Sequence, residues 1–311
     1  MKRAGPPIAP EFEQHLAVDF PEDPSMVPGN YRRLRDAMAA GFDSDEAVLA
    51  LADVQLTHLD AAGVPVIRIV PAGLAGTAPA VFSVHGGGLV AGGHRSGLAA
   101  LALLAQDLGV IVLTPDYRLA PEYPYPAASD DCWAAITWSV EHADELGIDP
   151  RRLVLVGGSA GGAISGGLAL RLRDAGGPEL AALMLIQPQL DDRNQLPSTF
   201  ELDDDIIWDR TSNLTAWSLY LGEGVDAPAY AAPARAESLA GLPPTFIEIG
   251  SSDLFRDECL AFAARASHDR VPVELHLWPG AFHGFDAVAG SAIAAAALAA
   301  RRNYLVRALG L

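Results

Sequence analysis

From about residue 52 onward, short apolar runs rich in β-branched residues alternate with longer stretches of helical pattern. Several of these runs are apolar throughout, which is typical of strands that helices cover on both faces. We therefore expect an α/β fold with a mainly parallel sheet. The expected strands are Asp53–Leu59, Val64–Val70, Ala80–His85, Val110–Pro115, Leu153–Gly157, Ala182–Gln187, Thr245–Gly250 and Val273–Leu277. The expected helices are Tyr31–Ala40, Ser44–Leu51, Gly97–Leu108, Ser129–Leu146, Ala160–Ala175, Asp257–Asp269 and Ser291–Leu309.

Two intervals of the chain do not share this alternation. Residues 1–30 are rich in proline and predict an arm with little regular structure of its own. The interval Leu190–Gly241 holds no strong strand over about 50 residues, which is much longer than an ordinary connection. We interpret it as a helical insertion that covers the active site together with residues 1–50.

Composition excludes several classes of protein. The 311 residues include 21 Lys and Arg against 39 Asp and Glu, a formal net charge of −18, and half of all residues are hydrophobic. So much apolar material excludes a disordered chain. The negative charge argues against nucleic-acid and membrane partners, since both require a basic face. Lys2 is the only lysine, which excludes Schiff-base chemistry and a phosphate-binding loop.

A G-x-S-x-G motif, residues 157–161, stands between an apolar strand and a helical stretch. In that context a nucleophilic serine, here Ser159, is held on a tight strand-to-helix turn. Small neighbours let the strand and the helix approach, and the helix dipole favours an anion that develops beside the hydroxyl. A glycine-rich turn that holds a phosphate is the alternative interpretation.

The segment His85-Gly86-Gly87-Gly88 ends an expected strand. Consecutive glycines expose backbone N–H groups, which an acyl-transfer enzyme needs around its developing oxyanion. A flexible hinge is the alternative interpretation of the glycines. We expect His85 to anchor this loop through a hydrogen bond rather than to transfer protons.

His283 and Asp253 each follow a later expected strand. A loop histidine such as His283 is by itself more often structural, but its position after Ser159 in the chain favours a general base. Asp253 is placed to accept the imidazole N–H. We prefer it to Asp257, because Asp257 stands where the first turn of a helix should begin and acids there are usually dipole partners. Serine, acid, histidine is the chain order of α/β-hydrolases.

With these residues, the chain resembles the bacterial hormone-sensitive-lipase-like carboxylesterases, the family IV esterases of the α/β-hydrolase superfamily. The resemblance is carried, between residues 85 and 285, by His85–Gly88, Asp116–Glu122, Gly157–Gly162, Asp253 with Arg256–Glu258, and His283–Phe285. It implies an α/β-hydrolase fold with a mostly parallel eight-stranded sheet and a helical cap. The implied division is an N-terminal cap segment at 1–50 and a catalytic domain at 51–311, with a cap insertion at about 190–241.

The resemblance also implies the roles of individual residues. Ser159 would be the nucleophile, His283 the base and Asp253 the orienting acid. The oxyanion would be bound by the backbone N–H groups of Gly87, Gly88 and Ala160. His85 and the segment Asp116–Glu122 look structural, since they would hold the oxyanion loop.

Three positions depart from the family's pattern without touching this triad. Gly158 stands where the family often has an acid, Leu89 where it often has an aromatic residue, and Leu254 where it usually has proline. We expect Leu89 to widen the pocket beside the oxyanion loop.

The remaining polar and aromatic residues predict no cofactor and no metal site, because neither a metal-ligand spacing nor a dinucleotide motif is present. Cys132 and Cys259 are expected to be buried small side chains. The acidic run Asp203–Asp205 predicts a solvated face or a helix start. A set of cap residues either lines a substrate cleft or forms the core of the cap: Ile206, Ile207, Trp208, Trp217 and Tyr220. Trp208 and Leu89 are our candidates for substrate binding.

The expected function is that of a serine carboxylesterase, which hydrolyses short- to medium-chain esters through an acyl-enzyme, with water as the second substrate. The alternatives are an amidase, a lactonase or an acyltransferase on the same triad, or a non-catalytic small-molecule receptor. Met1–Glu11 lacks the apolar run of a signal peptide, and the longest apolar stretch is too short to cross a bilayer. We therefore expect a cytoplasmic protein, and the resemblance suggests a homodimer.

Overall fold

The computed structural model describes residues 7–16, 25–201, 208–222 and 224–311, and it is built around one eight-stranded sheet. The strand order is β1-β2-β4-β3-β5-β6-β7-β8. The pairs β1–β2 and β2–β4 are antiparallel and the others are parallel. The strands are β1 Val54–Ala61, β2 Val64–Pro71, β3 Ala78–Val84, β4 Ile111–Pro115, β5 Ile148–Gly158, β6 Ala182–Ile186, β7 Thr245–Gly250 and β8 Val273–Trp278. The expected mostly parallel sheet of eight strands is confirmed.

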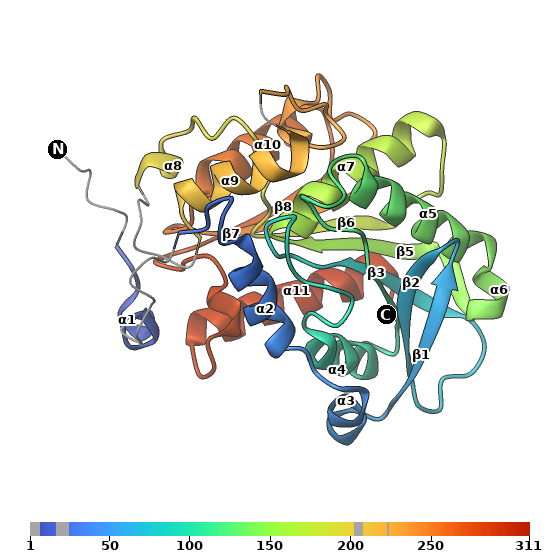
Figure 1. Cartoon of the computed structure of the whole chain (residues 1–311). Helices are drawn as coiled ribbons and strands as arrows, with labels where there is room; N and C mark the ends of the chain where they lie inside the picture. Colours follow the sequence, from blue (N-terminus) through green and yellow to red (C-terminus); the bar gives the residue numbers. More distant parts are fainter. Residues whose placement is uncertain (1–6, 17–24, 202–207, 223) are drawn as a thin grey trace.

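Helices cover both faces of this sheet, with α5, α7 and α10 above it in Figure 1 and α4 and α11 below it. The α-helices are α1 Pro10–Leu16, α2 Tyr31–Ala40, α3 Asp45–Leu51, α4 Leu98–Leu108, α5 Ala127–Glu141, α6 Ala143–Leu146, α7 Ala160–Ala175, α8 Ser198–Glu201, α9 Arg210–Leu221, α10 Arg256–His268 and α11 Ala292–Leu309. Short 3₁₀ turns η1 and η2 span Pro233–Arg235 and Phe285–Ala287. None of the described helices combines the length and the apolar character needed to cross a membrane.

One expected helix is in fact two. The stretch Ser129–Leu146 divides into α5 and α6 at His142, whose backbone leaves the helical region. The His142 ring stacks on Trp138 at a centroid distance of 4.3 Å, and its Nδ1 lies 2.9 Å from the Trp138 carbonyl oxygen. These contacts accompany the break, which apolar periodicity alone does not indicate.

The proline-rich arm contains a helix that we did not expect. Phe12 of α1 is fully buried, with its ring centroid 5.3 Å from that of Phe282 and 6.1 Å from that of Phe285. The Ala9 N–H donates to the Gly280 carbonyl at 3.0 Å. A seven-residue helix is marginal by itself, so these contacts with a distant part of the chain, which local pattern does not reveal, stabilise α1.

The interval 190–241 contains α8, α9 and η1, and no strand within its described residues. Trp217 and Tyr220 of α9 are buried, which favours the interpretation of these two side chains as core residues. The expectations for Asp203–Asp205, Ile206 and Ile207 fall outside the described residues. The N-terminal arm reaches this interval, since the Met26 N–H donates to Ser212 Oγ at 2.8 Å.

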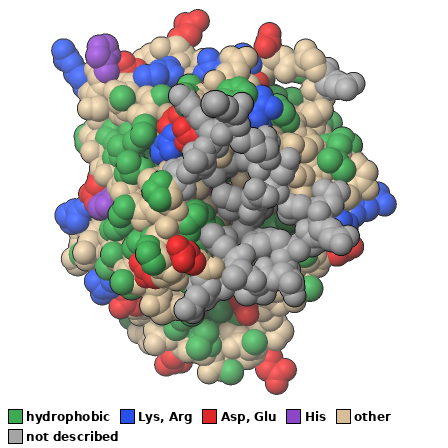
Figure 2. Space-filling model, turned by 90° about the vertical axis from the view of Figure 1, so that its left-hand side faces the viewer, with side chains coloured by type: hydrophobic (Ala, Val, Ile, Leu, Met, Phe, Trp, Pro, Cys, Tyr) green, Lys and Arg blue, Asp and Glu red, His purple; other side chains and the backbone are tan. Residues whose placement is uncertain are grey.

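The arm and this interval lie on the left of Figure 1, the side that Figure 2 turns toward the viewer. Basic, acidic and apolar side chains are interspersed there among the described residues.

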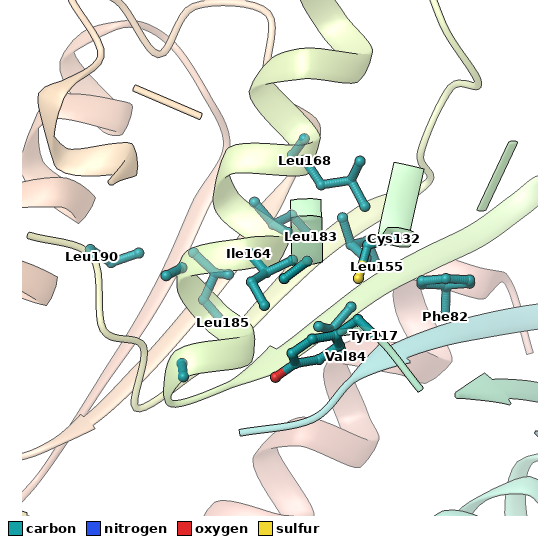
Figure 3. Packing of buried hydrophobic residues seen from close by; sticks show 14 of the residues in the cluster. Phe82, Val84, Tyr117, Cys132, Leu155, Ile164, Leu168, Leu183, Leu185 and Leu190 are labelled. Atoms are coloured by element: carbon teal, nitrogen blue, oxygen red, sulfur yellow. The ribbon is translucent and has the colours of Figure 1, made fainter. Parts of the chain in front are cut away.

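The core between the sheet and α7 is densely filled. Figure 3 shows leucines of β5, β6 and α7 interdigitating with Phe82, Tyr117 and Cys132. A second cluster fills the opposite face, where valines of β3, β4 and β5 meet α4 and α11. The polar residues of interest therefore gather at the ends of the strands.

Candidate active site

Ser159 occupies a strained turn between β5 and α7. Its φ of 53° and ψ of −121° lie outside the regions that a non-glycine residue normally adopts, at a cost of about 1–3 kcal/mol. A Cβ on Gly157 would lie 2.2 Å from the Gly161 carbonyl oxygen, and a Cβ on Gly161 would lie 2.2 Å from that of Val84. Only glycine fits at both positions, and the close approach of strand and helix fixes the serine.

The structure brings Ser159, His283 and Asp253 together. His283 Nε2 lies 2.9 Å from Ser159 Oγ, and His283 Nδ1 lies 2.8 Å from Asp253 Oδ2. Because the carboxylate can only accept, Nδ1 carries the proton and Nε2 of the neutral ring is free to accept the serine proton. The three side chains come from the ends of β5, β7 and β8.

Asp257 is not part of this arrangement. Its carboxylate accepts from the Ser198 N–H at 2.8 Å and from Arg256 Nε at 2.7 Å. Asp253 is fully buried, and its other oxygen accepts from the Phe255 N–H at 2.9 Å. The structure thus places Asp253 rather than Asp257 against the imidazole.

The surroundings of His283 favour its charged form. Burial lowers the pKa of His283, but the Asp253 carboxylate in contact with it, helped by Asp286, raises the pKa by more, so that it lies above its ordinary value. The Phe255 ring packs edge-on against the imidazole, with the ring centroids 5.1 Å apart. A carboxylate in this position is suited to stabilise an imidazolium.

Gln187, which sequence reasoning missed as a functional residue, holds the loop that carries His283. Its Oε1 accepts from the Gly284 N–H at 2.5 Å, and its Nε2 donates to Asp286 Oδ1 at 2.9 Å. Gln187 is buried directly after β6, at the sheet edge where ligand sites of α/β proteins gather. A polar residue at the end of an apolar strand was the available signal.

The glycine loop after β3 lies against Ser159. A Cβ on Gly86 would lie 3.2 Å from Ser159 Cβ, and Gly87 and Gly88 have positive φ angles of 123° and 59°. Among the hydrogen bonds of the described residues, the Gly87 and Gly88 N–H groups donate to no protein acceptor. Ala160 begins α7, so its N–H has no partner within the helix. These three N–H groups are thus without a protein acceptor among the described residues, and their role as oxyanion donors stays a prediction.

His85 holds this loop through a hydrogen bond and through stacking on Tyr117. Its Nδ1 lies 2.8 Å from the Gly86 carbonyl oxygen, and its ring stacks on Tyr117 at 4.0 Å. The Tyr117 hydroxyl donates to the His85 carbonyl at 2.8 Å. Burial lowers the pKa of His85 to about 4, so the ring is neutral and acts as a hydrogen-bonded support.

Arg35 of α2, within the expected N-terminal cap segment 1–50, binds the same loop. Arg35 Nε donates to the Val90 carbonyl at 2.9 Å, and one terminal nitrogen donates to the Ala120 carbonyl at 2.9 Å. The guanidinium also pairs with Glu122 at 2.9 Å. No sequence signal connects α2 with the segment 116–122, so sequence reasoning missed this contact.

The two candidates for substrate binding have different surroundings. Leu89 has a positive φ of 66° and is 1 % exposed, within the main core; its role in the pocket stays a prediction, which this burial does not favour. The Trp208 ring covers the oxyanion loop so closely that a Cβ on Gly88 would lie 2.3 Å from it. Its Nε1 donates to Asn213 Oδ1 at 3.3 Å, which fixes the ring.

Within the described ranges, no group of three or more His, Cys, Asp or Glu side chains is arranged to hold a metal ion. Cys132 and Cys259 are free and buried, as expected, and burial raises the pKa of both thiols. Neither is a reactive thiolate.

Comparisons with known proteins agree with this geometry. Residues 81–287 match the family described as alpha/beta hydrolase fold. Esterase LipI of Mycobacterium tuberculosis is 39 % identical over 68 % of this chain and 67 % of its own length. Ethyl acetate hydrolase of Pseudomonas putida is 32 % identical over 78 % of this chain and 80 % of its own.

Solved structures extend the similarity to nearly the whole chain. A bacterial heroin esterase superposes with a TM-score of 0.88 at 35 % identity, covering 97 % of this chain and 98 % of its own. An esterase from the bacterial hormone-sensitive lipase family superposes with a TM-score of 0.79 at 27 % identity, covering 97 % and 99 %. The chain therefore belongs to the α/β-hydrolase fold family and, within it, to the hormone-sensitive-lipase-like carboxylic ester hydrolases.

Proposed function

We propose that the protein hydrolyses short- to medium-chain carboxylic esters through a Ser159–His283–Asp253 triad and an acyl-enzyme. The observation that carries this proposal is the unbroken chain of two hydrogen bonds from Ser159 Oγ through the imidazole to a fully buried carboxylate. An activated serine requires this arrangement of nucleophile, base and orienting acid.

In the proposed reaction, Ser159 Oγ attacks the ester carbonyl while His283 Nε2 accepts its proton. The N–H groups of Gly87, Gly88 and Ala160 bind the oxyanion of the tetrahedral intermediate. The imidazolium then gives its proton to the departing alcohol, and the acyl group stays on Ser159. Water, activated by the same imidazole, attacks the acyl-enzyme and releases the carboxylic acid.

Residues 1–50 and about 190–241 serve, in this proposal, as the cap over the catalytic domain 51–311. Two contacts support such a cap: Trp208 covers Gly88 of the oxyanion loop, and Arg35 binds the carbonyl of Val90 in the same loop. Substrate would then enter between the cap and the strand ends.

The cytoplasmic location expected from the sequence stays a prediction, and so does the homodimer. One observation supports a dimer: β8 is an edge strand of the described sheet, and its side chains Leu275 and Leu277 are 39 % and 45 % exposed. An edge strand with exposed apolar side chains is suited to pairing with another copy.

The direct test compares hydrolysis of p-nitrophenyl butyrate by the wild type and by Ser159→Ala. The proposal expects a loss of about 10⁴-fold or more in kcat, because no other group can form the acyl-enzyme. Circular dichroism of the variant serves as the control for folding. Equal rates in the two proteins would contradict the proposal, and faster cleavage of an anilide or a lactone than of the ester would favour an amidase or a lactonase.

A further inference from the structure

A cavity of about 340 Å³ lies behind the nucleophile, between the sheet and the helices α4 and α11. Its volume is within the range of small-molecule sites. Its floor is formed by side chains of β3, β5 and β6, including Val81, Val156 and Met184. The helices contribute Leu104 and Leu298, so the greater part of the wall is apolar.

The inner end of this cavity lies beside Ser159. Gly86 and Gly158 both line it. Gly158 precedes Ser159 in the chain, and a Cβ on Gly86 would lie 3.2 Å from Ser159 Cβ, so both glycines adjoin the nucleophile. Successive residues of a strand face opposite sides of the sheet. Gly158 therefore faces the α4 and α11 side together with Val156, and away from Gly157.

The space at Gly158 is open. A Cβ there would find only the Ile186 carbonyl oxygen, at 3.9 Å, whereas a Cβ on Gly157 would collide with α7. The φ of Gly158 is not among the positive values, so this glycine is not required by backbone geometry. A side chain at position 158 would therefore point into the cavity.

The charged groups in the cavity wall are already paired. Arg301 lies 2.8 Å from Asp286 and also binds the buried Glu248, and Arg302 pairs with Asp107 at 2.6 Å. An ionic ligand would find these charges already paired with one another. The buried Nε2 of His85, which also lines the cavity, has no hydrogen-bond partner among the described residues. Apart from that nitrogen the wall is mainly apolar, and it is suited to a neutral, apolar chain.

We propose that this cavity holds the acyl chain of the ester substrate and that Gly158 is the opening through which the chain passes from Ser159. The inference rests on the proposed function. A group that lies behind the serine can stay there through acylation and deacylation, whereas the alcohol must leave after the first step. The acyl side of the ester is thus the part that this cavity fits.

The test measures kcat/KM for p-nitrophenyl octanoate and for p-nitrophenyl acetate, and follows the ratio of the two. Gly158→Val closes the opening, and Leu104→Trp fills the wall. Each buried methylene contributes about fourfold to binding, so loss of three to four methylenes lowers the ratio by about a hundredfold. We expect that decrease for Gly158→Val and about tenfold for Leu104→Trp.

Leu103→Trp is the matched control, because Leu103 is 43 % exposed on the same helix and does not line the cavity. It should keep the wild-type ratio. Thermal unfolding of each variant shows whether it folds. If Gly158→Val does not fold, the chain-length ratio of Leu104→Trp alone tests the proposal. Wild-type ratios in both cavity variants would overturn the proposal. So would a selective loss with octyl acetate relative to ethyl acetate, because the cavity would then hold the alcohol.

Failure of the proposed function would look different. If the wild type does not hydrolyse p-nitrophenyl acetate, or if Ser159→Ala hydrolyses it equally fast, the triad mechanism is wrong. The assignment of the cavity to the acyl chain, which depends on that mechanism, is then wrong too. If acetate hydrolysis depends on Ser159 but the octanoate-to-acetate ratio is the same in the cavity variants as in the wild type, only the cavity assignment is wrong.

Discussion

The two faces of the sheet are covered by helices in different ways. On one face, α7 buries 12 of its 16 residues and approaches β5 so closely that backbone meets backbone at Gly157 and Gly161. On the other face, α11 buries only five of its 18 residues. Between α11, α4 and the sheet remain a cavity and a network of buried charges around Arg301.

This difference follows the demands of the chemistry. The strained turn at Ser159 persists only where the surrounding structure leaves it no alternative, and the glycine contacts with α7 supply that constraint. On the proposed function a substrate chain, in contrast, needs space beside Ser159. The face opposite α7 supplies this space. It is less closely packed, and the charged side chains beside the cavity are held in ion pairs.

The largest expected effect concerns the charges of the open face. Arg301→Met leaves Glu248, which is fully buried, without its cation. Removing one partner of a buried ion pair costs about 3–5 kcal/mol of unfolding free energy. The measurement is urea unfolding of the variant against the wild type. Arg302→Met is the matched control: the Arg302–Asp107 pair is about half exposed, so its loss should cost about 0–1 kcal/mol. If both variants lose the same unfolding free energy, the buried ion pairs of Arg301 stabilise the fold no more than the exposed Arg302–Asp107 pair does.

Substitutions at the adjacent residues Gly157 and Gly158, which face opposite sides of the sheet, compare the packing of the two faces directly. Gly157→Ala places a Cβ 2.2 Å from the Gly161 carbonyl oxygen and should lower the unfolding free energy by about 1–3 kcal/mol through overpacking. Gly158→Ala points into open space and should be neutral, or stabilising by about 0.4–1 kcal/mol, because it restricts the unfolded chain. Chemical unfolding of the pair checks both values. A loss for Gly158→Ala as large as that for Gly157→Ala would break the comparison.

The smallest expected effect is a shift in pH dependence. In the proposed mechanism His283 acts as a base only when neutral. Its pKa is raised, so kcat/KM should rise with pH through a value above the ordinary 6.5 of histidine. Asp286 contributes to that raised pKa. Asp286→Asn should therefore lower the pKa and move the acid limb to lower pH. Asp226→Asn, at a side chain that is 96 % exposed, is the control. An acid limb that stays in place in Asp286→Asn would show that Asp286 does not act on the imidazole.

Much of this fold could be predicted from the sequence because local pattern determines it. Apolar runs of four to eight residues mark central strands, and all eight expected strands are present. The positions after those strands, together with the order of serine, acid and histidine, were sufficient to select Asp253 in preference to Asp257.

Features that depend on contacts between distant segments could not be predicted. Helix α1 forms because Phe12 packs on Phe282, about 270 residues away in the sequence numbering. Arg35 and Gln187 act on loops that only the folded chain brings to them. The cavity beside Gly158 is a property of how α4 and α11 sit on the sheet, which no single motif encodes.

The central claim is that Ser159 carries the acyl group during turnover. The direct measurement is rapid quenching of the enzyme with p-nitrophenyl butyrate, followed by intact mass analysis and peptide mapping. The account predicts a mass increase of one butyryl group, located on the peptide that contains Ser159 and missing from Ser159→Ala. An adduct on another residue, or turnover by Ser159→Ala at the wild-type rate, would contradict it.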